Sequence, residues 1–241
     1  MWARYFTNIY VLAIPEREPY VTSVMSKLGI SNVVYVQSGN SPLPPTHPTT
    51  LTAGLAITGG DYRTWSGHVA AMKHFLRSKG TRMLVFEDDI EFISTFVPDV
   101  LDLMKYVPRR AVVYLGRCWS QCWLDTPVVP GLVRTYKSSC MHAASLSREA
   151  AQYYVAQYPY APADDILQDI IAKYDLPAYA YQPGLFYQNQ TRFRSTAGVL
   201  RKDPATKDCK ADYSGYIYAA IVSVLLTATV CIVGYIERIV R

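Results

Sequence analysis

The sequence lacks several features that would place it in a common class of protein. Its five cysteines are an odd number, without the regular spacing of a small disulfide-bonded extracellular module. It contains no internal repeat and no disordered low-complexity segment. The 24 Lys and Arg residues are scattered except near the C-terminus, and the net charge is only +5, so no basic stripe for nucleic acid is indicated. We therefore expect a folded domain with an anionic small ligand, and no nucleic-acid partner.

The two ends of the sequence differ in apolar character. The run Ile9 to Ile14 is too short for a secretory signal, and the sequence PER stops it. Residues 215–236 are 22 residues without a charge. As a helix they would span about 33 Å, close to the hydrocarbon thickness of a bilayer. We predict a single C-terminal transmembrane helix here, followed by a short tail at 237–241.

The charges around this segment predict its orientation. Six Lys or Arg residues lie between 192 and 210, against two after residue 236. The positive-inside bias then puts the folded domain in the cytosol. The sequon Asn189-Gln190-Thr191 leaves a lumenal domain as the alternative. The predicted division is a catalytic domain at 1–200, a basic juxtamembrane linker at 201–214 and the membrane anchor.

Strand-like and helix-like segments alternate along most of the sequence. Apolar runs predict strands near 9–14, 32–36, 83–86, 111–115, 131–136, 140–146 and 178–181, and helical spacing predicts helices near 18–28, 64–78, 95–106, 147–157 and 162–174. This alternation is typical of an α/β fold with a mostly parallel sheet. The proline-rich stretch 41–60 reads as a long loop, of the kind that often serves as a lid or insertion.

In the sequence MLVFEDDIEF at 83–92, an apolar strand is followed directly by three carboxylates, Glu87, Asp88 and Asp89. An unpaired buried carboxylate costs several kcal/mol, so these groups must face water or hold a positive charge. Oxygen ligands select a hard cation, Mn²⁺ or Mg²⁺, which in turn binds phosphate oxygens. The alternative is a plain acidic turn before a helix N-terminus.

In a mostly parallel sheet, ligands bind beyond the carboxyl ends of the strands. That rule puts Arg17, Ser38, Gly39 and the 87–89 triplet on one rim. A base or ribose beside Ser38 and Gly39, a diphosphate near Arg17 and a metal at the triplet form one consistent site. The arrangement predicts nucleotide-sugar binding.

A second cluster of metal-ligating residues lies further along the chain. Cys118, Cys122, Cys140 and His142 could form a zinc site if their strands were neighbours. Ordinary buried thiols are the alternative, because the spacing is unusual for a zinc module. Whether Cys118, Cys122 and Cys140 bind a metal or pair with one another stays open.

Several separated motifs occur in an order that resembles glycosyltransferase family 25. They are IYVLAIPEREPY from residue 9, the turn Val36-Gln37-Ser38-Gly39, the pair Gly67-His68, the acidic triplet 87–89, CMHAASLSREAAQYY from residue 140, and the segments Pro162-Ala163-Asp164-Asp165 and Pro183 to Gln188 that close the set. The resemblance covers residues 8–196. It implies a GT-A-type, Rossmann-like fold with a mixed, mostly parallel sheet and helices on both faces.

The resemblance also implies roles for individual residues. Asp89 would ligate the metal that bridges the diphosphate, and Glu87 or Asp88 would hold the ribose or a metal-bound water. The remaining donor-site residues are Arg17, Ser38, Gly39, His68, His142 and Gln188. Asp164 and Asp165 are the candidates for the catalytic base, although carboxylates in the first turn of a helix also complement its dipole.

The function that the resemblance implies is inverting, metal-dependent transfer of a hexose, galactose in this family, from a UDP-sugar to a hydroxyl on a glycan, protein or lipid. Two alternatives use the same residues differently. One is a non-catalytic membrane scaffold or adhesion protein with this fold, and the other is a metal-dependent phosphohydrolase.

Overall fold

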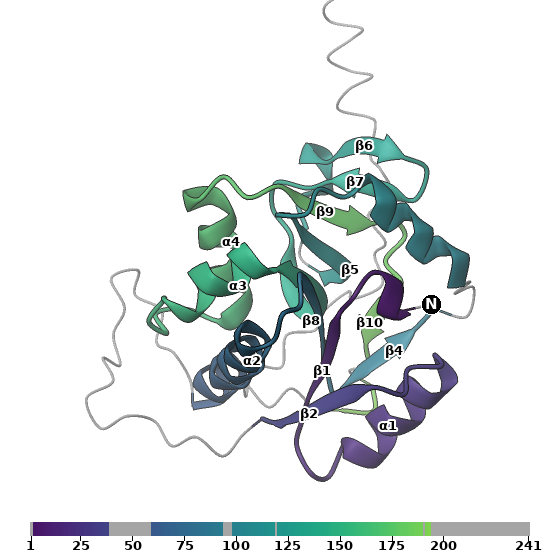
Figure 1. Ribbon diagram of the computed structural model, residues 1–241, viewed down its shortest axis with the longest axis vertical. Helices are drawn as coiled ribbons and strands as arrows, with labels where there is room; N and C mark the ends of the chain where they lie inside the picture. Colours follow the sequence, from purple (N-terminus) through teal and green to yellow (C-terminus); the bar gives the residue numbers. More distant parts are fainter. Residues whose placement is uncertain (1, 39–58, 94–97, 119, 190, 194–241) are drawn as a thin grey trace, which may run out of the picture.

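A central eight-stranded sheet organises the protein in the computed structural model, which describes residues 2–38, 59–93, 98–118, 120–189 and 191–193 (Figure 1). The strands are β1 (Asn8–Ala13), β2 (Val33–Gln37), β3 (Arg82–Glu87), β5 (Val112–Cys118), β6 (Thr126–Val129), β7 (Leu132–Arg134), β8 (Ser139–Ser147) and β9 (Ala178–Tyr181). They are ordered β2-β1-β3-β8-β5-β9-β7-β6. A separate pair, β4 (Ile90–Phe92) and β10 (Phe186–Gln188), forms a small antiparallel sheet.

The large sheet is mixed. β1 is parallel to β2 and β3, and β5 is parallel to β9. β8 runs antiparallel between β3 and β5, and β7 runs antiparallel between β9 and β6. The predicted mixed α/β sheet is confirmed, and most strands share one direction. The central position of β8 was not predicted, because a strand's neighbours are set by pairing across the sheet.

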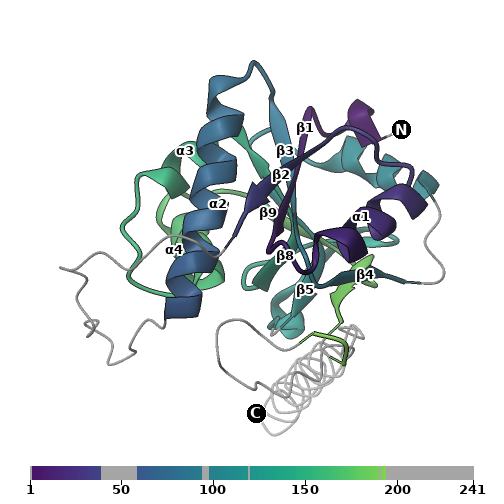
Figure 2. The same cartoon turned by 90° about the horizontal axis from the view of Figure 1, so that it is seen from below.

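Helices pack on both faces of the sheet, as expected (Figure 2). One face is covered by α2 (Gly59–Arg77), α3 (Arg148–Val155) and α4 (Ala163–Lys173), and the other by α1 (Glu18–Lys27), the 3₁₀ helix Pro98–Tyr106 and the small sheet. Strand β1 shows the reason. Tyr10 and Leu12 are buried under α2, whereas Val11 is buried on the α1 side.

The helix boundaries follow local sequence signals. Ser147 caps α3, since its side-chain oxygen accepts a hydrogen bond from the Ala150 amide. Pro162 immediately precedes α4, where a fixed backbone angle suits a helix start. The predicted helix at 95–106 is a 3₁₀ helix that begins at Pro98. The helix expected from residue 64 already begins at Gly59, so part of the predicted loop is helical.

Residues 120–138 form a projection at the far edge of the sheet from β2. It contains the 3₁₀ helix Cys122–Leu124 together with β6 and β7, and a Cys118–Cys140 disulfide closes its base. The disulfide excludes both the zinc site and the free-thiol alternative for Cys118 and Cys140, because bridged sulfurs are neither. The sequence left open whether these cysteines pair, since the spacing alone could not show that the ends of β5 and β8 meet.

Several predictions fall on residues outside the described part of the chain. They include the lid at 41–58, the turn residue Gly39, the linker at 201–214 and the membrane helix at 215–236. Within the described ranges, no helix has both the length and the apolar character to cross a membrane. The division into catalytic domain, linker and anchor therefore stays a prediction.

Candidate functional site

The end of β3 places the acidic triplet beside the end of β1. These strands are parallel neighbours, and Glu87 is in register with Leu12. The two strands therefore end at the same edge of the sheet, with α2 over one face and the small β4–β10 sheet nearby. The expected rim of strand ends is present here.

Glu87 joins three elements through its two oxygens. Its Oε1 lies 3.2 Å from Nε2 of His68, which is fully buried on α2. Its Oε2 accepts a hydrogen bond from Nε2 of Gln188 on β10, at 3.3 Å. Burial acts to raise the pKa of Glu87, but the His68 hydrogen bond and nearby imidazoles outweigh it, and the pKa is lowered. Glu87 is thus held as a carboxylate.

Asp89 faces the same amide group. Its Oδ2 lies 3.5 Å from the Gln188 Nε2, while its buried Oδ1 has no hydrogen-bond partner in the described part of the chain. Burial, followed by the charges of Glu87 and Asp88, raises the pKa of Asp89 to about 7. A buried carboxylate with an unpaired oxygen beside a second carboxylate is a place where a cation would be stabilised.

Asp88 is engaged elsewhere. Its Oδ2 accepts a hydrogen bond from the Ile14 amide at 2.8 Å, and its Oδ1 pairs with Nη1 of Arg17 at 3.0 Å. Burial raises the pKa of Asp88, against the opposing effects of the amide and the guanidinium. Asp88 therefore ties the turn after β1 to the end of β3. Unlike Glu87 and Asp89, it makes no hydrogen bond to the Gln188 amide in the described part of the chain.

Arg17 lies at the start of α1, inside a group of aromatic and basic side chains that sequence reasoning missed. Its guanidinium lies 4.9 Å from the ring centre of Phe193, and that ring packs against Tyr20 at 4.8 Å between centres. Arg192 lies over the Tyr20 ring at 4.5 Å. These contacts fold residues 191–193 onto α1. No local pattern could have signalled this, because the partners are more than 170 positions apart.

His142 is buried on β8, behind the triplet. Its Nε2 lies 3.3 Å from the carbonyl oxygen of Phe186, and its Nδ1 has no partner within the described ranges. Burial lowers the pKa of His142, although the charges of Glu87 and Asp164 oppose the change. The backbone of Gly116 passes so close that an added Cβ would lie 2.3 Å from this Nε2.

Asp164 lies in the first turn of α4, close to the start of β8. Its Oδ2 accepts a hydrogen bond from the Cys140 amide at 3.2 Å. Burial raises the pKa of Tyr114 and Tyr154, and the charge of Asp164 raises it further as a smaller effect. Asp165 follows it in the same turn. Asp164 therefore faces the buried polar region that also contains His142.

Ser38 follows the end of β2, and its amide donates to the Ala13 carbonyl at 3.0 Å. It touches the helix that carries His68, since an added Cβ on Gly67 would lie 3.5 Å from the Ser38 Cβ. The structure thus brings together Ser38, His68, Glu87, Asp89 and Gln188 around the ends of β1 to β3. Gly39 lies outside the described residues.

Across the described residues, no three His, Cys, Asp or Glu side chains converge to hold a metal ion. Glu87 and Asp89 are the two carboxylates that contact a common group, the side-chain amide of Gln188. Two carboxylate oxygens suit a hard cation whose other ligands come from a phosphate-bearing substrate or water. The residues present fit such an ion, with two ligands instead of the three expected.

Comparisons with known proteins add little to this geometry. The sequence matches no protein-family model and none of the curated proteins. Among solved structures, A197 from STIV shares 11% identity, covering 75% of this chain and 83% of that one, with a TM-score of 0.43. UDP-glucose pyrophosphorylase complexed with UDP-glucose shares 12% identity, covering 73% and 68%, with a TM-score of 0.40.

A glucose-1-phosphate thymidylyltransferase from Bacillus anthracis has 10% identity, 76% and 70% coverage and the same TM-score of 0.40. Likenesses at this level carry no argument about function.

Proposed function

We propose that the described part of the chain is a metal-dependent glycosyltransferase domain of GT-A type that uses a nucleotide sugar. The observation that carries the proposal is the convergence of Glu87 and Asp89 on the Gln188 amide at the carboxyl end of β3. Strand ends of this kind are where α/β sheets bind nucleotides. The unpaired Oδ1 of Asp89 supplies a ligand position that no protein group fills in the described ranges.

Glu87 and Asp89 would hold Mn²⁺ or Mg²⁺ against the diphosphate of a UDP-sugar. The ion supplies Lewis-acid stabilisation of the departing nucleoside diphosphate. His68 orients Glu87 and keeps it ionised, and Gln188 would move its amide toward a sugar or phosphate oxygen. Asp88 and Arg17 hold the turn that shapes the site, instead of serving the metal directly.

An inverting transfer also needs a base that takes the proton of the acceptor hydroxyl. Asp164 supports this role through its place near the buried His142 and Tyr114, whose pKa values its charge acts to raise. Its bond to the Cys140 amide fixes one oxygen and leaves the other for an acceptor. Asp165 stays a second candidate in the same turn. Galactose as the transferred hexose follows from the family resemblance.

The test is calorimetric titration of the protein with Mn²⁺ and UDP, followed by an assay of UDP release from a panel of UDP-sugars. Asp89→Asn and Glu87→Gln should each weaken Mn²⁺-dependent UDP binding and lower transfer on the order of 100-fold or more. Glu149→Gln is the control and should leave Mn²⁺ affinity within about twofold, because Glu149 pairs with Arg110 and follows Ser147, which is in register with Arg82 at the opposite end of β3 from Glu87.

Asp164→Asn distinguishes a catalytic base from a residue that only supports the fold. It should leave UDP-sugar binding intact while transfer collapses, and equal loss of both would assign Asp164 a structural role. Release of inorganic phosphate, with no dependence on an acceptor, would favour the phosphohydrolase. Absence of nucleotide binding with every donor would favour the scaffold and overturn the proposal.

A further inference from the structure

The projection formed by residues 120–138 is a rigid unit at the open edge of the sheet. The Cys118–Cys140 disulfide joins its two ends, and Oγ of Ser120 donates to Oγ of Ser138 at 3.1 Å just inside it. The Gln121 amide also bonds the Lys137 carbonyl at 3.1 Å. Closure at the base restricts the backbone, so the side chains on the projection are presented in a fixed arrangement.

The projection exposes apolar side chains to an unusual degree. Trp123 is 61% exposed, Tyr136 is 56% exposed and Val128 is 39% exposed. They are three of the six large hydrophobic side chains that are exposed within the described ranges, although the projection is short. Trp and Tyr side chains, with an apolar ring and a polar tip, suit the boundary between lipid and water.

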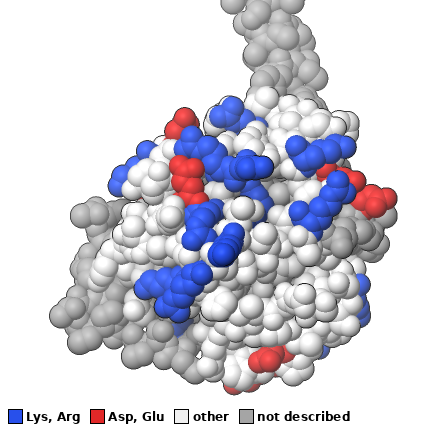
Figure 3. Space-filling view, in the orientation of Figure 1, with Lys and Arg blue, Asp and Glu red and all other residues white. Residues whose placement is uncertain are grey.

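The exposed charge on the projection is positive. Asp125 is its sole acidic residue, and that carboxylate is buried in an ion pair with Arg117 at 2.6 Å. Arg134 and Lys137 are exposed, and the Arg134 guanidinium lies 5.4 Å from the ring centre of Tyr136. Figure 3 shows that basic side chains predominate over the upper half of this face of the molecule, where β7 lies in Figure 1. The projection thus combines exposed rings with positive charge.

The outermost strand discourages one alternative occupant. β6 is the last strand of the sheet, and an open edge could pair with a strand of a second copy. Pro127 lies within β6 and has no amide hydrogen to donate, a common protection of edge strands. A pairing of two β6 strands is therefore disfavoured, and the exposed rings call for a different partner.

We propose that the 120–138 projection lies on the surface of an anionic lipid bilayer, with Trp123, Val128 and Tyr136 at the headgroup level and Arg134 and Lys137 beside lipid phosphates or carboxylates. The sequence puts 21 residues, 194–214, between the last described residue and the uncharged segment 215–236. Fully extended they reach about 70 Å, enough for the domain to lie against the bilayer in this way. The inference depends on the predicted membrane segment and is independent of the proposed function.

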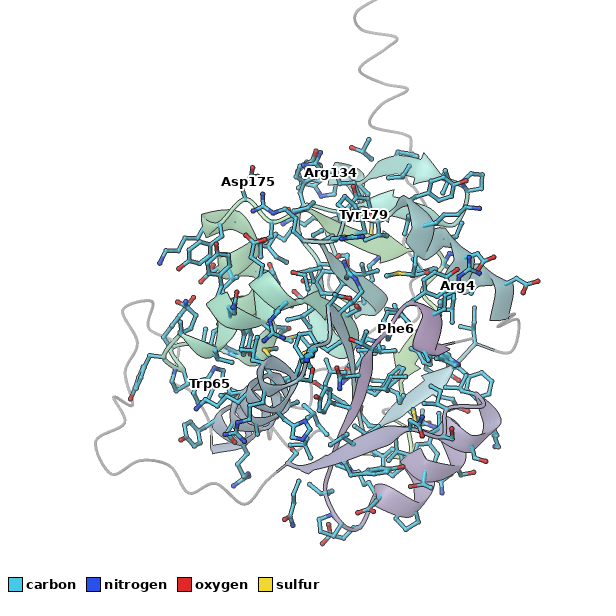
Figure 4. All side chains as sticks on the ribbon, in the orientation of Figure 1. Arg4, Phe6, Trp65, Arg134, Asp175 and Tyr179 are labelled. Atoms are coloured by element: carbon cyan, nitrogen blue, oxygen red, sulfur yellow. A yellow bond between two sulfur atoms is a disulfide. The ribbon has the colours of Figure 1, made fainter. Side chains whose placement is uncertain are left out.

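The test uses the full chain reconstituted in vesicles of phosphatidylcholine and phosphatidylserine, in which a brominated lipid quenches tryptophan fluorescence near the bilayer. The intact chain should be quenched, and Trp123→Phe should lose at least half of the quenching. Trp65→Phe is the matched control and should not reduce it, since Trp65 lies on α2, well away from Arg134 of the projection (Figure 4).

A second part of the experiment tests the role of charge with the double variant Arg134→Glu and Lys137→Glu, at positions whose side chains are exposed. This pair should reduce quenching at least twofold on phosphatidylserine vesicles and change it little on pure phosphatidylcholine. Equal quenching of Trp123→Phe and the intact chain would overturn the proposal. Failure of the chain to float with vesicles would overturn it as well, as would a dimer in detergent that Trp123→Phe dissociates.

Discussion

At the scale of single residues, the three adjacent carboxylates of the triplet have different partners. Glu87 and Asp89 share the Gln188 amide, whereas Asp88 binds the Ile14 amide and Arg17. The turn that begins after Glu87 is responsible, because it points successive side chains toward different elements. A run of like charges in the sequence thus becomes one ion pair and one candidate cation site.

Asp89 gives a prediction about stability and pH. Its pKa of about 7 lies above its ordinary value of 3.8, so the folded chain binds this proton more tightly than the unfolded chain. Stability therefore falls as the pH rises from about 4 to about 7. In EDTA at pH 8, Asp89→Asn should be more stable than the native chain by roughly 2–4 kcal/mol, with a smaller gain at pH 5.

Urea denaturation at the two pH values measures this difference. Addition of Mn²⁺ at pH 8 should stabilise the native chain and leave Asp89→Asn unchanged. A gain that is equal at both pH values would show that the charge of Asp89 is not the cause.

The ion pair between Asp88 and Arg17 gives a second prediction. It is about nine-tenths buried on both sides, so Arg17→Met leaves the Asp88 carboxylate, whose pKa burial already raises, without this counter-charge. We expect the free energy of unfolding at pH 7 to fall by roughly 1–3 kcal/mol. Denaturant titration measures the loss, and Arg17→Met should cost much less in an Asp88→Asn background than it costs alone.

At the scale of elements, two glycines show how closely the site is packed. An added Cβ on Gly116 of β5 would lie 2.3 Å from the His142 ring and 2.5 Å from the Phe186 carbonyl oxygen. On Gly67 of α2, the nearest atom would be the Ser38 Cβ, at an ordinary 3.5 Å. Gly116→Ala should therefore lower the free energy of unfolding by about 1–3 kcal/mol, because His142 on β8 and Phe186 on β10 must both move away from β5.

Gly67→Ala is the control for that substitution. Alanine is the better helix former by up to about 1 kcal/mol, so this variant should be as stable as the native chain or slightly more stable. Thermal melting of the two variants compares them directly. Similar destabilisation by both would mean that β5 and β8 are not packed as closely as described.

Most elements could be predicted from the sequence, and their partners could not. Apolar runs and caps located β1, β2, β3, α3 and α4 to within a few residues. The short strands β6 and β10 were missed, since three or four residues carry no periodicity of their own. β10 matters most for function, because it supplies Gln188 to the site.

At the scale of the whole molecule, the disulfide gives a further prediction. Cys118 and Cys140 are 22 positions apart, and a closed loop of this length stabilises a fold by about 3 kcal/mol. Replacing both by Ser should lower the free energy of unfolding by about that amount. Dithiothreitol should then have little further effect on the double variant in urea titrations, and an unchanged effect would assign the bridge no role.

The disulfide also bears on where the domain resides. Disulfides persist chiefly in oxidising compartments, whereas the charge balance around 215–236 predicts a cytosolic domain. The bridge therefore favours the lumenal alternative. The sequon residue Asn189 donates to Oε2 of Glu91 at 2.7 Å, so its side chain is already engaged in the fold. The orientation remains a prediction, which protease protection of sealed vesicles would decide.

The sequence by itself determined the alternation of strands and helices, the position of the acidic strand end and the uncharged C-terminal segment. These are properties of nearest neighbours and of periodicity along the chain. The tertiary structure decided which carboxylates contact the Gln188 amide, which one pairs with Arg17, and that Cys118 is bonded to Cys140. The physical reason is that each of these contacts joins elements whose order across the sheet is set by packing and strand pairing, which local sequence does not encode.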